Sequence, residues 1–432
     1  MSAFADGSQP STRGRLAAGV PGRGDGPGAL LSLIRTMGGA TRRDLMRATN
    51  LARATVDARL DMLASHGYVV HREVPRAKGR PPQMFEFNES GGYLLCIDMG
   101  SSHTRLGIAD LGGRLVAHTS AELDLSMGPG VTLGKVGTLL RELVRAEGID
   151  PRYVLGVGVG VPGPVELTGH MVRLPFDATA LAPWTEMVIS QEIRAFLPAI
   201  GVGDVPVEVD KDANNMALGE WRTSWPEVRD LVVLKVGMTL TCGIVANAET
   251  VRGTIGMAGD LEHIPDGTSD VMCRCGQRGC AEATASGRGI VRLLGPAAGS
   301  IHTSRELVAL QNAGRQDVIQ LMREAGRRLG VLIGTAISTL NPQLVVIGGN
   351  LAEANTLLLD EIRSVAMSRV HPLIASSTTI IGSKISDQAG LYGAAHLALR
   401  AVLDPASVDV GISNGRTLSV DRSPAHRRVL AR

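Results

Sequence analysis

Four apolar segments that each run into a glycine-containing turn constrain the fold of this chain more than any other feature. They are residues 92–97, 157–161, 232–234 and 344–347, and their turns contain Gly100, Gly163, Gly237 and Gly348. Short apolar runs bounded by turn residues are typical of buried strands. Helical segments lie between them, one of which starts after the strand-like residues 207–210. The sequence therefore predicts an α/β body.

The chain is too long for a single hydrophobic core. It has 432 residues, 44% of them hydrophobic and 20% charged, which is an ordinary globular composition. We therefore expect two or three domains. No apolar run is long enough to span a bilayer, and the first residues lack the pattern of a secretory signal. We expect a cytoplasmic protein that has no membrane partner.

The first 90 residues are the basic part of the chain. They contain 13 Arg and Lys against 8 Asp and Glu, a balance of +5, in a chain whose formal net charge is +2. A basic end piece on a near-neutral body is typical of a nucleic-acid module, although a solvated surface would have the same charge. Residues 1–27 are rich in Gly, Ser, Pro and Arg and predict a disordered arm.

The next residues have the pattern of three helices. The first begins at Ala29, the second is capped by Thr41 and ends near Ala48, and the third runs from about Ala52 to His66. A helix, a short turn and a longer helix form a helix-turn-helix, whose second helix enters the major groove of DNA. A plain helical hairpin is the alternative.

Two strand-like segments follow, at residues 68–72 and 84–87, with a basic tip rich in Gly and Pro between them. This pattern predicts a wing, which can place cations on DNA phosphates. In the longer helix, Val56, Leu60 and Leu63 would pack inward. The candidate DNA contacts are Arg42, Arg43, Arg53, Thr55 and Arg59 on the helices, with Lys78 and Arg80 on the wing.

Two hairpins of the body have features of phosphate sites. In the first, Asp98 can position a metal ion, while Gly100 and Ser102 can offer a backbone N–H and a hydroxyl to a phosphate. The second contains Gly237 and Gly243, but threonines stand at positions 239 and 241. Side chains there obstruct the approach of a phosphate and disfavour positive φ. An ordinary turn remains the alternative, because many hairpins contain Asp and Gly.

One histidine and three cysteines form the most specific pattern of the chain. Cys273, Cys275 and Cys280 lie within eight residues and follow His263. One imidazole and three thiolates can close a tetrahedral structural zinc site, and such closely spaced thiols would otherwise oxidise readily. Three unrelated buried thiols are the alternative. We predict a zinc site.

The order of these motifs resembles the ROK family of repressors, open reading frames and sugar kinases, from about residue 29 to residue 400. The resemblance implies an N-terminal winged helix-turn-helix and a two-lobed actin-like sugar-kinase fold, with a cleft for sugar and nucleotide between the lobes. It also implies a zinc site of this His-Cys-Cys-Cys type. We expect an arm at 1–27, the DNA-binding domain at 28–90, the first lobe at 91–215, the second lobe at 216–403 with its last helix packing back on the first, and a loose tail at 404–432.

The resemblance also implies roles for residues of the cleft. Asp212 matches the catalytic base of kinase members, although an Asp at a strand-to-helix junction is also an ordinary N-cap. Kinase members have Asn where this chain has Lys211 and Glu where it has Asp260, and a further Asn is replaced near Phe176 and Asp177. The implied ligand-binding residues are Lys211, Asp212, Asp260, His263 and Glu282.

Both hairpins depart from the kinase patterns, because Ser101-Ser102 replaces Gly-Thr and the threonines of the second hairpin replace glycines. We interpret them as former phosphate sites. The hypothesis is a transcriptional repressor, a homodimer or homotetramer that binds a double-stranded DNA operator and senses a sugar or sugar-derived effector. The alternative is an active sugar kinase that uses ATP and Mg²⁺ with Asp212 as general base.

Overall fold

The structure, a computed structural model, describes residues 26–419 except 74–82, 101–102, 124, 167, 173–181, 186, 266, 268, 300 and 354. The chain divides into two compact units. Within the described residues, the smaller unit contains residues up to Phe87 together with Leu403–Thr417, and the larger unit contains Asn88–Val402 with Leu418 and Ser419. Most of the predicted arm, the wing tip with Lys78 and Arg80, and Ser102 lie outside the described residues.

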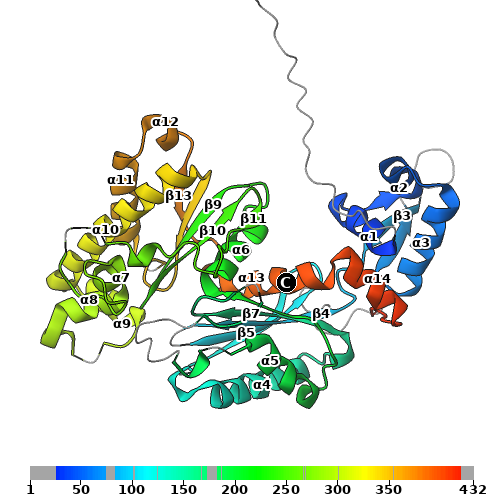
Figure 1. Cartoon of the computed structure of the whole chain (residues 1–432), viewed down its shortest axis with the longest axis horizontal. Helices are drawn as coiled ribbons and strands as arrows, with labels where there is room; N and C mark the ends of the chain where they lie inside the picture. The colour runs from blue at the N-terminus through cyan, green and yellow to red at the C-terminus, as the bar shows by residue number, and fades with distance from the viewer. Residues whose placement is uncertain are drawn as a thin grey trace, which may run out of the picture. The chain divides into compact units, whose positions relative to one another are not determined.

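The smaller unit contains the three helices and the strand pair that the sequence predicts (Figure 1). Thr41 caps the second helix, accepting a hydrogen bond from the N–H of Asp44 in a reciprocal capping box, and Asn50 ends that helix in the left-handed conformation. Val56, Leu60 and Leu63 are completely buried, which confirms the inward face of the third helix. The elements are α1 (Pro27–Thr36), β1 (Ala40–Thr41), α2 (Arg42–Thr49), α3 (Arg53–Ser65), β2 (Val69–Glu73) and β3 (Gln83–Phe87), with sheet order β1-β3-β2.

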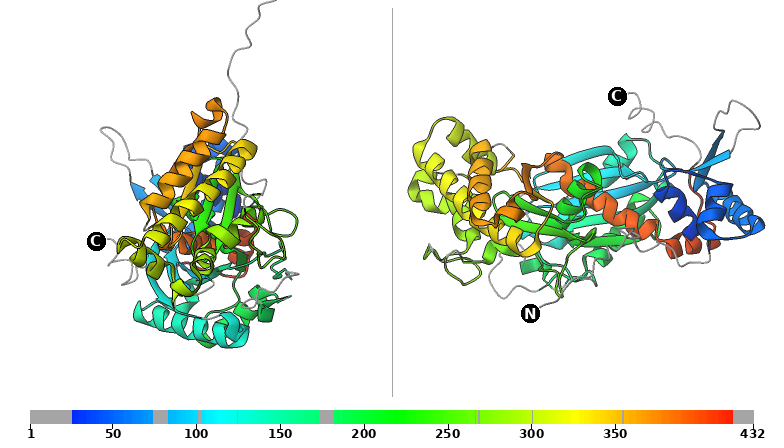
Figure 2. Two further views of the ribbon diagram at one scale, coloured as in Figure 1. Left: turned by 90° about the vertical axis from the view of Figure 1, so that its left-hand side faces the viewer. Right: turned by 90° about the horizontal axis from the view of Figure 1, so that it is seen from above.

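Residues 404–419 do not form the loose tail that the sequence analysis expects. They contain α14 (Pro405–Ser413), which packs beside α1, as Figure 1 and the right-hand view of Figure 2 show. The N–H of Gly28 donates to Asp409 Oδ1 at 2.7 Å, and a Cβ on Gly28 would lie 2.1 Å from the carbonyl oxygen of Pro405. The expectation fails because the apolar surface that covers α14 comes from the other end of the chain.

The larger unit is built on two five-stranded sheets of the same topology. In each sheet an antiparallel meander of three strands continues into two parallel strands. The first has the order β6-β5-β4-β7-β8 and the second β11-β10-β9-β12-β13. The strands are β4 (Tyr93–Met99), β5 (Thr104–Asp110), β6 (Leu115–Ala121), β7 (Val154–Val161), β8 (Val207–Lys211), β9 (Leu231–Val236), β10 (Leu240–Ala246), β11 (Glu249–Thr250), β12 (Leu344–Gly348) and β13 (Thr379–Gly382).

Helices cover both sheets, and each sheet has its own hydrophobic core. The long helices α10 and α11 pack side by side against the second sheet, whereas α13 packs against β4 and β7 of the first sheet and against α6 (Figure 2). The helices are α4 (Pro129–Ala146), α5 (Ile189–Phe196), α6 (Asp212–Ser224), α7 (Ala281–Ala285), α8 (Gly287–Leu294), α9 (Ser304–Asn312), α10 (Gln316–Leu340), α11 (Thr356–Arg369), α12 (Pro372–Ala375) and α13 (Ala389–Val402). Among the described helices, none combines the length and the apolar character that crossing a membrane requires.

Candidate functional site

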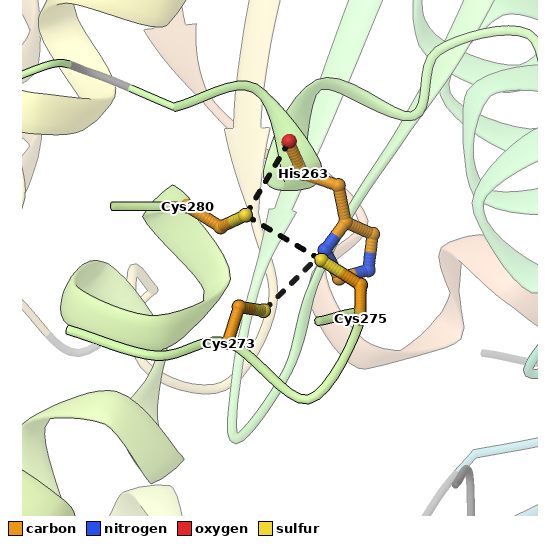
Figure 3. Close-up of side chains that lie close together, drawn as sticks. All are labelled: His263, Cys273, Cys275 and Cys280. Atoms are coloured by element: carbon orange, nitrogen blue, oxygen red, sulfur yellow. Dashed lines mark hydrogen bonds between the residues drawn. The ribbon is translucent and has the colours of Figure 1, made fainter. Parts of the chain in front are cut away.

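The predicted metal ligands come together in one cluster. The ligand atoms of His263, Cys273, Cys275 and Cys280 all lie within 4.8 Å of one another (Figure 3). Cys273 Sγ is 3.6 Å from His263 Nδ1, and the Sγ atoms of Cys275 and Cys280 are 3.6 Å apart. Tetrahedral zinc with bonds of about 2.0–2.3 Å separates its ligand atoms by roughly 3.5–3.8 Å. The cluster could therefore hold a metal ion, and the two pairs at 3.6 Å have the separation of zinc ligands.

A tight turn arranges the cysteines. The N–H of Cys273 donates to the carbonyl of Gln277 at 2.8 Å, and Gly276 enters the left-handed region with φ of +87°. Cys280 is the N-cap residue of α7, and His263 ends a single 3-10 turn at residues 261–263. The ligands are thus held by one loop, one helix start and one short helical turn.

The second hairpin, between β9 and β10, is closed by its own backbone. Gly237 donates its N–H to the carbonyl of Thr239 at 3.1 Å, and no residue from 237 to 243 has positive φ. The carbonyls of Gly237 and Met238 accept the N–H groups of Gly287 and Arg288 at the start of α8, at 2.9 and 3.0 Å. The threonines of this hairpin therefore stand in a backbone that does not need glycine.

Gly243 has a different role from the predicted phosphate contact. A Cβ at this position would lie 2.2 Å from the carbonyl oxygen of Ala213, so glycine is needed for β10 to approach α6. A Cβ on Gly237 would meet nothing closer than 3.6 Å. Gly243 is thus explained by packing, and Gly237 stands at an open turn.

Asp212 lies at the start of α6 and pairs with a lysine. Its Oδ2 is 2.6 Å from Lys235 Nζ, and its Oδ1 accepts the N–H of Ala213 at 2.8 Å. The N-cap position belongs to Lys211, which makes no side-chain cap bond, so the simple N-cap interpretation of Asp212 is wrong by one residue. The carboxylate that kinase members use as a base is here engaged in an ion pair.

The first hairpin, between β4 and β5, contains a buried charge group. Asp98 is 5% exposed, and Arg105 NH1 lies 3.8 Å from its Oδ2. Burial raises the pKa of Asp98, an effect that the positive charges of Lys235 and Arg105 oppose. Burial and the neighbouring Arg105 lower the pKa of His103 to about 4, so this imidazole is neutral at pH 7.

Lys211 and the acidic residues before the predicted metal ligand His263 form a second charged group. Lys211 is 6% exposed and donates to the carbonyl of Ala258 at 3.0 Å. Burial and the charge of Asp260 place the pKa of Glu262 well above its usual value, and Lys211 opposes this shift. Lys211 and Asp260 thus both lie close enough to Glu262 to act on its charge, and the sequence analysis did not single out Glu262.

Glu282 connects the metal loop to the second hairpin. Its Oε2 accepts the N–H of Leu240 at 2.8 Å, and its Oε1 is 3.6 Å from Arg274, which stands between two of the metal-ligand cysteines. Burial raises the pKa of Glu282, and the charges of Arg274 and Arg288 oppose the shift. Glu282 thus anchors a hairpin backbone in addition to its predicted role toward a ligand.

The predicted DNA contacts of the smaller unit divide into two kinds. Arg53 at the start of α3 has a side chain that is 78% exposed, and Arg43 is also exposed. Arg42, in contrast, pairs with Asp57 at 2.6 Å, donates to Gln83 Oε1 at 2.7 Å and lies over the ring of Phe85. Arg42 therefore joins α2 to α3 and β3, and its guanidinium is already engaged.

The sequence analysis did not predict three cationic residues of the site. Lys235 lies in a strand whose other residues are all apolar. This pattern could have indicated an ion pair, because an unpaired lysine is rarely buried among such residues. Arg252 pairs with Asp210 at 2.7 Å, and Arg274 reaches Glu282. Loop arginines such as these two have no local pattern that reveals their distant partners.

Comparison with known proteins matches the fold and the order of the sites. The model of the ROK family matches residues 94–401. A xylose repressor of Caldicellulosiruptor bescii is 26% identical over 379 residues, covering 84% of this chain and 92% of that protein. A ROK family transcriptional regulator, a homologue of E. coli Mlc, superposes with a TM-score of 0.72 at 22% identity, covering 90% of this chain and 98% of that one.

A ROK family glucokinase from Streptomyces griseus, solved with glucose and AMPPNP, superposes with a TM-score of 0.60 at 24% identity. It covers 71% of this chain and 99% of the glucokinase chain. The regulator match therefore extends over a larger share of this chain than the kinase match. With the family model matching more than half of its residues, the chain belongs to the ROK family.

Proposed function

We propose that this protein is a ROK-type transcriptional repressor whose body senses a sugar or a sugar-derived effector without phosphorylating it. The observation that carries the proposal is the smaller unit, in which a short turn joins α2 to α3 and a strand pair follows. The match to xylose repressors covers 84% of the chain, more than the larger unit alone contains. Their name makes xylose a first effector to test.

We propose that the smaller unit is a winged helix-turn-helix. Its α3 buries one face through Val56, Leu60 and Leu63 and leaves the start of the helix accessible, where Arg53 is exposed. In a helix-turn-helix these first residues of the second helix meet base edges. Thr55 and Arg59 are the further candidates on α3, and Arg43, Lys78 and Arg80 are candidates for phosphate contacts.

Arg42 has a supporting role in this proposal. Its ion pair with Asp57 and its position over Phe85 fix α2 against α3 and the strand pair. Asp57 also lies 3.5 Å from Arg53, so one carboxylate orients an inner and an outer arginine. Replacement of Arg42 would weaken DNA binding through the geometry of α3.

We further propose that the His-Cys-Cys-Cys cluster binds structural zinc. Four protein ligands close a tetrahedral site and leave no position for a substrate, so the metal would stabilise the loop without chemistry of its own. The segment from Asp260 to Glu282 contains three of the proposed effector contacts, Asp260, His263 and Glu282. The other two, Lys211 and Asp212, lie outside it. Zinc would therefore shape the effector site.

The proposal is tested by fluorescence anisotropy with DNA from upstream of the protein's own gene, at near-physiological salt. Arg53→Ala should weaken specific binding by about tenfold or more, because one base contact contributes about 1–3 kcal/mol. Arg152→Ala is the matched control, since the Arg152 side chain is also 78% exposed but belongs to the larger unit. Equal affinity of both variants and the wild type would contradict the recognition role of α3.

The kinase hypothesis is a second candidate because Asp212 is present and glucokinases share the fold. The residues do not fit Mg²⁺ and ATP well, since Lys235 Nζ lies on the Asp212 carboxylate and threonines stand in the second hairpin. ATP-dependent formation of a sugar phosphate that disappears in Asp212→Asn would support this candidate.

We propose that the repressor acts as a homodimer or homotetramer on a two-fold DNA site, as pairs of such modules do. The effector would change operator affinity, and the operator would change effector affinity by the same factor.

A further inference from the structure

Lys235 and Asp98 stand at corresponding places in the two sheets. Each lies on the strand that enters the hairpin, two residues before the turn glycine, which is Gly237 in one sheet and Gly100 in the other. The two hairpins therefore present opposite charges from equivalent positions. Lys235 interrupts an otherwise apolar strand, and its side chain is 22% exposed.

The Lys235 ammonium faces two carboxylates. Its Nζ is 2.6 Å from Asp212 Oδ2 and interacts electrostatically with Asp98. Burial opposes its charge, but Asp212 and Asp98 outweigh this effect and keep the pKa of Lys235 above its usual value. The ammonium is charged at neutral pH and is held among side chains from β4, β9 and α6.

The formal charges of Asp98, Asp212, Lys235 and Arg105 balance without an added ion. Asp98 and Asp212 contribute two negative charges, and Lys235 and Arg105 contribute two positive charges. Arg105 also lies 3.6 Å from Asp387, so part of its charge is shared. Asp98 Oδ1 is buried and has no hydrogen-bond partner among the described residues. An unpartnered carboxylate oxygen beside a second carboxylate is the kind of donor pair that binds a divalent cation.

We infer that the Lys235 ammonium is a built-in substitute for a divalent cation, which excludes Mg²⁺ and its nucleotide complex from Asp98 and Asp212. The inference rests on the proposed non-catalytic function and deepens it by naming the residue responsible. A neutral sugar can still lie beside Asp212, whereas the metal that phosphoryl transfer requires has no place. The same ammonium, on β9 of the second sheet, pairs with Asp212 on α6 and interacts electrostatically with Asp98 on β4 of the first sheet.

The test uses Mn²⁺ as the probe and the full-length protein with its zinc in place. Electron paramagnetic resonance measures bound Mn²⁺ in the wild type, Lys235→Met and Lys235→Ala. Wild-type protein should bind no Mn²⁺ at Asp98, and the neutral variants should gain one site with affinity higher by about tenfold or more. The gained site should disappear in the double variant Lys235→Met with Asp98→Asn.

Lys235→Arg is the matched control, because it keeps the positive charge and should stay without the new site. Mn²⁺ binding by the wild type that is lost in Asp98→Asn would overturn the inference, and this measurement needs no variant at Lys235. Failure of folded Lys235→Met and Lys235→Ala to gain a site would also overturn it. Operator binding, measured on the same samples, tests the proposed function separately. Wild-type protein that binds neither the operator DNA nor Mn²⁺ would contradict the repressor proposal and support this inference.

Discussion

The hairpin between β4 and β5 and the hairpin between β9 and β10 occupy the same place in two sheets of identical strand order. In each hairpin the N–H of the turn glycine donates to a backbone carbonyl within three residues, that of His103 in one and that of Thr239 in the other. Their chemistry is opposite, because one presents Asp98 and the other Lys235. Two hairpins at equivalent places in sheets of the same topology can thus present opposite charges.

The comparison also separates two uses of glycine. Gly243 of the second hairpin is required by the contact between β10 and α6, whereas a Cβ on Gly237 would make only an ordinary contact of 3.6 Å with the carbonyl oxygen of Thr239. The presence of glycine in the second hairpin is therefore not evidence that phosphate binds there.

The largest effect is expected from loss of the proposed zinc. Glu282 accepts the N–H of Leu240 in the second hairpin and follows Cys280 by two residues, so the proposed zinc loop is connected directly to this hairpin. In Cys275→Ser, amide exchange measured by mass spectrometry should become faster by about tenfold or more around Leu240. The first hairpin should keep its protection. Cys96→Ala, which removes a buried thiol outside the cluster, should retain the metal, and equal loosening of both hairpins would refute this link.

A charge reversal at the second hairpin should come next. Lys235→Glu would place a third carboxylate beside Asp98 and Asp212, and we expect the free energy of unfolding to fall by about 3 kcal/mol. Lys135→Glu, on the exposed surface of α4, should change it by no more than about 0.5 kcal/mol. Denaturant unfolding of both variants measures the difference. Equal stabilities would show that the two hairpins are not electrostatically coupled.

The two glycines provide a sharper test of packing. Gly243→Ala should destabilise the protein by about 2–3 kcal/mol, because its Cβ collides with the backbone of Ala213. Gly237→Ala should lower the free energy of unfolding by no more than about 0.5 kcal/mol. Thermal unfolding of the pair measures this, and a larger loss for Gly237→Ala would reverse our assignment of the two roles.

The smallest effect concerns the first hairpin at acid pH. Burial and Arg105 lower the folded-state pKa of His103 to about 4, from an ordinary value of 6.5. A depressed pKa means that protonation favours the unfolded state, so this stability is complete above pH 6.5 and is lost as the pH falls toward 4. Between pH 7 and pH 5 the wild type should lose about 2 kcal/mol more than His103→Gln. Parallel pH dependences in denaturant unfolding would contradict this.

Local patterns predicted much of this structure. The capping box at Thr41, the inward face of α3 and the four clustered metal ligands all depend on residues that are near one another in the sequence. The position of α14 was missed because its partner Gly28 is 381 residues away from Asp409. The ion pair of Lys235 was missed for the same reason, since the sequence shows a lysine in an apolar strand but not the carboxylates that it meets.

The central claim is that the body reports a sugar to the DNA-binding unit without phosphorylating it. The most direct measurement is operator anisotropy with a sugar panel that includes xylose, each with and without Mg²⁺ and ATP, followed by a search for sugar phosphate. The account predicts that one sugar shifts operator affinity equally under both conditions and is recovered unchanged. A shift that requires ATP, or recovery of the sugar as its phosphate, would contradict it.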